Sequence, residues 1–131
     1  MPMNSVSLTN KVIIVTGASQ GLGRQIARRC VRLGAHIVIT GRSKKRLKGI
    51  TSELELLKSA GQKIVPACFD VQNIDDCAAV VNSAIQDLGS IHTLINNAGI
   101  WGQMGRFADE DIEAWLESIN VNLIGSVYMI K

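Results

Sequence analysis

The stretch Thr16-Gly17-Ala18-Ser19-Gln20-Gly21-Leu22-Gly23 stands between an apolar run and a segment of helical periodicity. The apolar run, residues 11–16, is continuous and rich in β-branched side chains, which is typical of a strand covered on both faces of a parallel sheet. After the stretch, apolar residues recur at helical spacing up to Leu33, and Gly34 follows where a helix can end with a positive φ. The glycines therefore mark an abrupt turn from a strand into a helix.

The alternation of strand and helix continues through the rest of the sequence. Three further strands are predicted, at residues 37–40, 64–69 and 93–96. One helix begins after the N-cap Ser43 and ends by Gly61, the next begins after the N-cap Asn73 and closes at Gly89, and a long helix covers residues 110–131. This order predicts an α/β fold with a doubly wound parallel sheet of the Rossmann type, incomplete, with about four βα units.

Each glycine of the first turn has a physical task in such a fold. Gly17 allows the sharp bend from strand to helix, and Gly21 lets a diphosphate approach the backbone. Gly23 lets the helix lie close to the sheet. The unpaired N–H groups and the positive dipole end of the helix then face the anion. The turn therefore predicts a dinucleotide site.

Composition limits the alternatives. The chain has 131 residues, of which 47% are hydrophobic and 19% charged, as expected of a globular domain that buries a core. No apolar run approaches the roughly 20 residues that a membrane span needs, and the N-terminus lacks the features of a secretory signal. Three cysteines, Cys30, Cys68 and Cys77, show no disulfide or metal spacing. We expect a cytoplasmic protein without a metal, whose cysteines are buried free thiols.

Charge is divided unevenly along the chain. Residues 1–63 carry twelve Lys or Arg and two acids, a net charge of +10, whereas residues 64–131 carry two basic residues and nine acids, a net charge of −7. Nucleic-acid binding would rest on the basic half alone. Since a charge run is usually a solvated helix face, no nucleic-acid partner is expected.

Four motifs together resemble the short-chain dehydrogenase/reductase family, in order and in spacing. They are the glycine turn at 16–23, Asp70-Val71 after the third strand, Asn96-Asn97-Ala98-Gly99 after the fourth, and Asn120-Val121-Asn122-Leu123 with Gly125 in the last helix. The resemblance is strongest to members of the 3-oxoacyl-carrier-protein reductase type. It implies a nicotinamide cofactor and hydride transfer to or from a carbonyl. Residues 1–9 are then an N-terminal tail, and residues 10–131 the N-terminal half of an NAD(P)-binding Rossmann domain.

The resemblance also implies a role for each site residue. Asp70 accepts a hydrogen bond from the adenine amino group, Val71 packs on the adenine ring, and Asn122 interrupts its helix, frees a backbone carbonyl and holds a water of the proton relay. This makes Asn122 the one catalytic residue expected in the chain. The expected cofactor-binding residues are those two at the adenine together with Gly17, Ser19, Gln20, Gly21, Leu22, Gly23, Arg42, Asn97, Ala98 and Gly99.

The end of the second strand bears on the choice of cofactor. The sequence there reads Thr40-Gly41-Arg42-Ser43, with Gly41 where NAD-dependent members carry an acid that binds the ribose 2′-hydroxyl. Arg42 can instead bind a 2′-phosphate through paired hydrogen bonds, backed by the cluster 44–46. We therefore expect NADP rather than NAD. Gln20 stands where many NADP-dependent members carry a second basic residue, and Arg24 is expected to compensate in part.

The family's catalytic serine and its Tyr-x-x-x-Lys motif are absent from these 131 residues. Tyr128 is the only tyrosine, and Lys131 follows it by three residues instead of four, so this pair is not expected to be catalytic. We expect the chain to be the N-terminal, cofactor-binding portion of an NADP-dependent reductase of a small-molecule carbonyl or alcohol. The resemblance also implies that the helix at 110–131, with its apolar stripe, forms a homodimer or homotetramer interface in a complete protein. The alternative is a naturally truncated, non-catalytic protein that binds nucleotide or pairs with a full-length relative.

Overall fold

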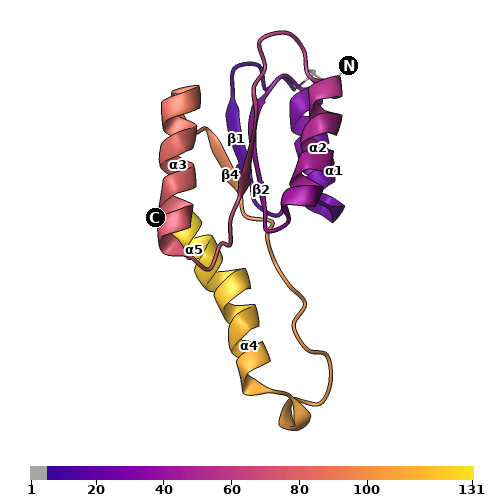
Figure 1. Cartoon of the computed structure of the whole chain (residues 1–131), viewed down its shortest axis with the longest axis vertical. Helices are drawn as coiled ribbons and strands as arrows, with labels where there is room; N and C mark the ends of the chain where they lie inside the picture. The colour runs from indigo at the N-terminus through magenta and orange to yellow at the C-terminus, as the bar shows by residue number, and fades with distance from the viewer. Residues whose placement is uncertain (1–5) are drawn as a thin grey trace.

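Four parallel strands form the centre of the molecule. The computed structural model describes residues 6–131, and within them the strands stand in the order β3-β2-β1-β4, each paired in parallel with its neighbour (Figure 1). Their bounds are Val12–Val15 for β1, His36–Gly41 for β2, Ile64–Cys68 for β3 and Thr93–Ile95 for β4. All four strands lie where the sequence predicts them.

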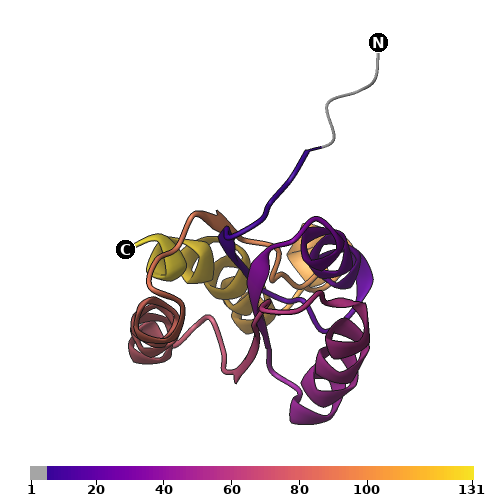
Figure 2. The same cartoon turned by 90° about the horizontal axis from the view of Figure 1, so that it is seen from above.

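Helices cover both faces of this sheet, as Figures 1 and 2 show. On one face lie α1 (Gly21–Arg32) and α2 (Lys44–Leu57), and on the other lie α3 (Ile74–Leu88) and α5 (Gly125–Ile130). The doubly wound arrangement is thus confirmed. A further helix, α4 (Ile112–Ile119), continues the line of α5 beyond the end of the sheet (Figure 1).

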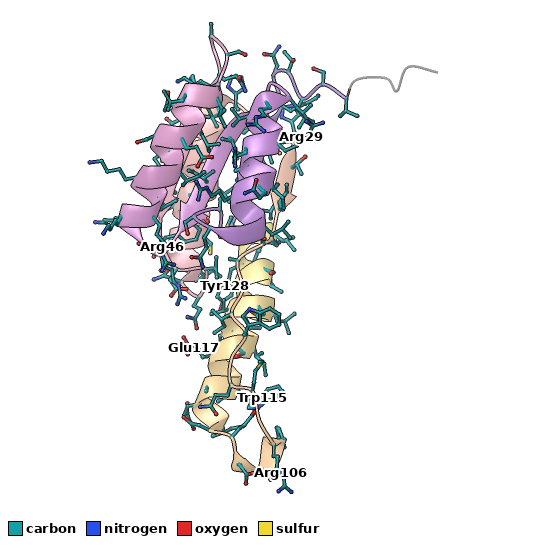
Figure 3. The ribbon with its side chains drawn as sticks, turned by 90° about the vertical axis from the view of Figure 1, so that its right-hand side faces the viewer. Arg29, Arg46, Arg106, Trp115, Glu117 and Tyr128 are labelled. Atoms are coloured by element: carbon teal, nitrogen blue, oxygen red, sulfur yellow. The ribbon has the colours of Figure 1, made fainter. Side chains whose placement is uncertain are left out.

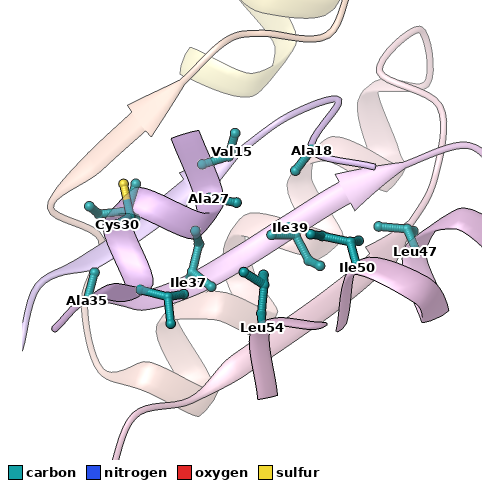
Figure 4. Packing of buried hydrophobic residues seen from close by; sticks show 12 residues of the cluster. Val15, Ala18, Ala27, Cys30, Ala35, Ile37, Ile39, Leu47, Ile50 and Leu54 are labelled. Carbon is teal, nitrogen blue, oxygen red and sulfur yellow. The ribbon is translucent and has the colours of Figure 1, made fainter. Parts of the chain in front are cut away.

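The strand side chains alternate between two hydrophobic clusters. All four residues of β1 are buried; Ile13 and Val15 belong to the cluster under α1 and α2, whereas Ile14 belongs to the cluster on the opposite face. Figure 4 shows Ile37 and Ile39 of β2 against the buried side chains that α2 contributes, Leu47, Ile50 and Leu54. This two-sided burial explains why β1 and β2 read as continuous apolar runs.

Local helix signals are read correctly from the sequence. Ser43 accepts a hydrogen bond from Arg46 N at 3.3 Å, and Asn73 accepts from both Asp75 N and Asp76 N, so both predicted N-caps are confirmed. Gly89 ends α3 with φ +83°, as predicted. By contrast α2 ends at Leu57, before Gly61 is reached.

The predicted long helix is divided into three parts. Between α4 and α5, Asn120–Ile124 is π-helical, and Asp111 caps α4 by accepting from Glu113 N. A 3₁₀ turn, Phe107–Asp109, precedes α4. No helix within residues 6–131 is long and apolar enough to cross a bilayer.

The expectation of three buried cysteines is wrong for Cys68. Burial raises the pKa of the Cys30 thiol, and burial together with the nearby carboxylates of Asp76 and Asp70 raises the pKa of Cys77, but Cys68 is exposed. The reason is its position as the last residue of β3, the outer strand of the sheet.

Candidate functional site

A cleft of about 1010 Å³ opens at the carboxyl ends of the strands. Such a position is where open α/β sheets bind ligands. Twelve of the thirteen residues predicted for the site line it: Gly17, Ser19, Gln20, Gly21, Leu22, Arg42, Asp70, Val71, Asn97, Ala98, Gly99 and Asn122. The fold therefore brings four separate sequence motifs into one cleft.

Gly23, the thirteenth, lies behind the cleft and determines how closely its walls approach. A Cβ on Gly23 would overlap the Asn97 side-chain amide and lie 2.6 Å from the carbonyl oxygen of Gly17. Gly17 has φ +63°, and a Cβ there would lie 2.8 Å from Ala98 Cα. Both glycines are thus required by the contact between the turn after β1 and the loop after β4.

The N-terminus of α1 differs from those of α2, α3 and α4. Ser43, Asn73 and Asp111 each cap their helix with a side-chain oxygen, whereas Gln20, at the N-cap of α1, makes no such bond. The first N–H groups of α1 are left to face the cleft, where a Cβ on Gly21 would meet open space. Backbone donors and a positive dipole end in an open cleft suit an anion such as a phosphate.

Thr16, which the sequence did not single out, supports the floor of the cleft, which Asn97 and Ala98 line. Its hydroxyl oxygen accepts from Asn97 N at 3.0 Å and Ala98 N at 2.9 Å, and Thr16 is only 1% exposed. The Asn97 side-chain amide donates back to the carbonyl oxygens of Thr16 at 2.9 Å and Gly17 at 3.1 Å. The signal that could have found Thr16 is a hydroxyl residue at the very end of a buried strand, next to the first glycine.

Two guanidinium groups reach the part of the cleft beyond β2. Arg42 Nη1 lies 3.9 Å from Asp70 Oδ2, and Arg46 Nη1 donates to Gln20 Oε1 at 2.8 Å. Figure 3 shows Arg46 at the end of the α1–α2 layer that faces the α4–α5 segment, whereas Arg29 lies at the opposite end. Among the described residues that line the cleft, Asp70 is the single acid.

Arg24 was expected to compensate for Gln20 at the cofactor site, but its side chain pairs with Glu53 and does not line the cleft. Its Nε donates to Glu53 Oε2 at 2.9 Å, and Arg28 Nε lies 2.9 Å from Glu53 Oε1. Glu53 on α2 therefore pairs with two of the four arginines of α1, and neither Arg24 nor Arg28 lines the cleft, whereas Arg46 stands beside Gln20. The sequence could not show which arginine reaches the cleft, because this depends on which residues of α1 and α2 face each other.

Asp70 and Val71, which follow the end of β3, form one wall of the cleft. Asp70 Oδ1 accepts from Gln72 N at 3.0 Å, which fixes the carboxylate at the cleft. Val71 is 8% exposed and belongs to the core cluster under α3 and α5, where a Cβ on Gly125 would lie 2.6 Å from Val71 Cγ2. A residue predicted to pack on a ligand is thus held in place by the last helix.

Asn122 clamps the loop after β4 with both ends of its amide. Its Oδ1 accepts from Ile100 N at 2.8 Å, and its Nδ2 donates to Ile100 O at 2.9 Å. Asn122 lies in the π-helical segment, and its own carbonyl oxygen accepts from Ser126 Oγ at 3.2 Å. The resemblance implied a role for this carbonyl, whereas nothing in the sequence pointed to the two side-chain bonds to Ile100. Tyr128 packs against the core cluster under α3 and α5.

Known proteins with similar sequences and structures point to the same family as the four motifs. Residues 11–131 match the model of the short chain dehydrogenase family. The ketoacyl reductase HetN of Nostoc sp. is 35% identical over 125 residues, which are 95% of this chain and 42% of that protein. A short-chain type dehydrogenase/reductase from Mycobacterium ulcerans superposes with a TM-score of 0.91 at 31% identity, over 95% of this chain and 45% of that one.

A metagenomic short-chain oxidoreductase in complex with NADP superposes with a TM-score of 0.84 at 31% identity, over 97% of this chain and 55% of that one. The chain spans between 26% and 53% of the length of eight curated relatives that it matches.

Proposed function

The chain belongs to the short-chain dehydrogenase/reductase family, and from this premise we propose that it is the N-terminal, cofactor-binding portion of an NADP-dependent oxidoreductase. In this proposal the whole protein transfers a hydride between NADPH and a small-molecule carbonyl or alcohol. Since the chain covers about half or less of its relatives, the residues that select the substrate are proposed to lie outside it.

The observation that carries the choice of NADP is the pair of guanidinium groups beside the end of β2. A guanidinium binds a phosphate through two parallel hydrogen bonds, and Arg42 and Arg46 both line the cleft there. Gly41 provides no carboxylate to accept from a free 2′-hydroxyl. A structural relative in complex with NADP supports the same choice.

The chain's residues fit the other parts of such a cofactor. The uncapped N-terminus of α1 suits the diphosphate, Asp70 and Val71 are proposed to hold the adenine, and Asn97 to Gly99 to pass beside the nicotinamide ribose. The nicotinamide supplies or accepts the hydride. Asn122 positions the backbone at Ile100, and we propose that its carbonyl also holds a water of the proton relay.

The protein is proposed to associate with copies of itself and to reside in the cytoplasm. Apolar side chains remain exposed along α4 to α5, namely Ile112, Trp115, Leu116, Ile119, Leu123, Val127 and Ile130. A stripe of this kind marks a protein interface, and we propose a homodimer or homotetramer through it. The three cysteines are free thiols, as is usual in the reducing cytoplasm, where we place the protein.

Cofactor titration tests the proposal. NADPH and NADH are titrated into the full chain and followed by the fluorescence of the reduced nicotinamide; NADPH is expected to bind at least about tenfold more tightly, because a charged hydrogen bond contributes about 1.5–3 kcal/mol. Arg42→Ala is expected to remove most of that preference and to leave NADH binding unchanged. Arg29→Ala, at the far end of α1, is the control. Equal affinities for the two cofactors would contradict NADP dependence.

A further inference from the structure

Both histidines of the chain, His36 and His92, lie at the amino ends of the strands, opposite the cleft. Val12, the first residue of β1, is in register with His36, and the register of β1 with β4 brings His92 to its other side. The register of β2 with β3 places Lys63 beside His36. Lys63, His36, Val12 and His92 therefore form one row across the sheet.

A ring nitrogen of each histidine takes the place of a backbone carbonyl in this row. Val12 N donates to His92 Nδ1 at 3.0 Å, while His92 N donates to Val12 O at 2.9 Å. Lys63 N donates to His36 Nδ1 at 3.1 Å. A ring nitrogen that accepts a hydrogen bond carries no proton, so each ring is neutral here and carries its proton on Nε2. The two side chains extend the hydrogen bonding of the sheet by one row.

A second proton on either ring abolishes its bond. Nδ1 then becomes a donor and faces the backbone N–H from which it accepted before. Imidazole is the side chain that ordinarily changes its charge between about pH 5 and 8. Since the His92 side chain is exposed, protons and water reach it directly. Mild acid therefore acts on the first row of the sheet.

Other titratable and charged groups stand at this end of the elements around the two rings. They are the side chains of Lys11, Arg29, Cys30, Arg32, Glu55, Lys58, Lys63 and Asp87. Lys58 pairs with Glu55, and Lys63 Nζ donates to the backbone oxygen of Asp87 at 2.9 Å. Side chains of these types ordinarily keep their charge between pH 5.5 and 7.5, so a change in the row over this range comes from the imidazoles.

The bond at His92 holds a short strand. β4 has three residues, and within residues 6–131 it pairs with β1 alone. Its carboxyl end leads to Asn97 and Ala98, whose backbone N–H groups donate to Thr16 beside the cleft. Because the strand is so short, release of its amino end at His92 also weakens the end that builds the cleft.

We propose that His92 is an acid-sensitive latch for β4, with His36 as a weaker counterpart for β3, where the corresponding bond is exposed. The unprotonated His92 ring keeps β4 docked on β1, and protonation weakens the docking and loosens the cleft. This response to pH does not depend on which cofactor the cleft binds.

Hydrogen exchange of the full chain at pH 7.5 and 5.5, followed by mass spectrometry and corrected for intrinsic exchange rates, tests the latch. In the unaltered chain the opening equilibrium of residues 91–97 is expected to rise about fivefold at pH 5.5, because a partly buried hydrogen bond is lost. His92→Asn is expected to remove this rise, since an amide oxygen can replace Nδ1 as the acceptor and does not titrate. His92→Ala is expected to be about fivefold more open than the unaltered chain at pH 7.5 and to respond little to acid.

His36→Asn is the matched control, because it makes the same change two strands away and is expected to leave the acid response of residues 91–97 intact. Nitrogen NMR of the unaltered chain gives a second measurement, in which His92 Nδ1 is expected to be unprotonated at pH 7.5. A protonated Nδ1 at that pH would overturn the latch, as would an acid response in His92→Asn equal to that of the unaltered chain, or a His92→Ala variant as closed as the unaltered chain at pH 7.5. An unprotonated Nδ1, with an acid response lost in His92→Asn and kept in His36→Asn, supports it.

Discussion

The Thr16 hydroxyl is a single group that accepts hydrogen bonds from two partly buried backbone donors. Replacement with Val keeps the shape of the side chain but leaves Asn97 N and Ala98 N without their acceptor. A fully buried unsatisfied donor costs about 1–3 kcal/mol; since these two are partly buried, Thr16→Val is expected to lower the free energy of unfolding by about 1–2 kcal/mol. Urea denaturation followed by circular dichroism measures the loss.

Thr16→Ser is the matched control for this change, because it removes the methyl group and keeps the hydroxyl. It is expected to stay within about 1 kcal/mol of the unaltered chain. A valine variant as stable as the serine variant would mean that the hydroxyl does not hold the floor of the cleft.

The π-helical segment Asn120–Ile124 connects the last helix to the loop after β4. Asn122→Ala removes both hydrogen bonds to Ile100 while leaving the core under α3 and α5 untouched. Because these bonds are exposed to water, the free energy of local opening of residues 99–111 is expected to fall by only about 1 kcal/mol. Hydrogen exchange followed by mass spectrometry measures this as faster exchange in that loop.

Asn120→Ala, in the same π-helical segment, is the control. Asn120 is exposed, and its side chain makes no hydrogen bond within the described residues 6–131. Only the Asn122 variant is expected to loosen the loop. Equal effects of the two variants would mean that helix propensity, and not the clamp, controls the loop.

At the scale of single helices and strands, the features that depend on local sequence could be predicted. The four strands follow from apolar runs, and the caps Ser43 and Asn73 follow from one residue each. The exposure of Cys68 could not be predicted, because a strand's place at the edge of a sheet depends on the order of all strands. The position of Arg46 beside Gln20 depends likewise on how two helices face each other. Local patterns predict elements, and contacts between elements need the fold.

The whole molecule leaves two surfaces without a neighbour inside the described residues. There β1 is the only strand that pairs with β4, and the stripe on α4 to α5 is exposed. Leu123 is 59% exposed within this stripe. Leu123→Glu is expected to weaken self-association at least about tenfold, because a contact of this size contributes more than 1.4 kcal/mol. Light scattering behind size-exclusion chromatography measures the mass against concentration.

Leu56→Glu is the matched control for association. Leu56 is 88% exposed on α2, on the opposite side of the sheet from α5, so the same change is made outside the stripe. It is expected to leave the assembly unchanged. If both glutamate variants associate alike, or the unaltered chain is monomeric at every concentration, the stripe is not the interface.

The floor of the cleft joins parts of the chain that are synthesised far apart in time. Thr16 and Asn97 are separated by 81 residues, and neither the Asn97 amide nor the wall at Ala98 exists until β4 has docked beside β1. A growing chain on the ribosome therefore displays its glycine turn long before it has a place to hold a ligand. Any ligand of this cleft binds only after the late strand arrives, and its binding energy then opposes the departure of that strand.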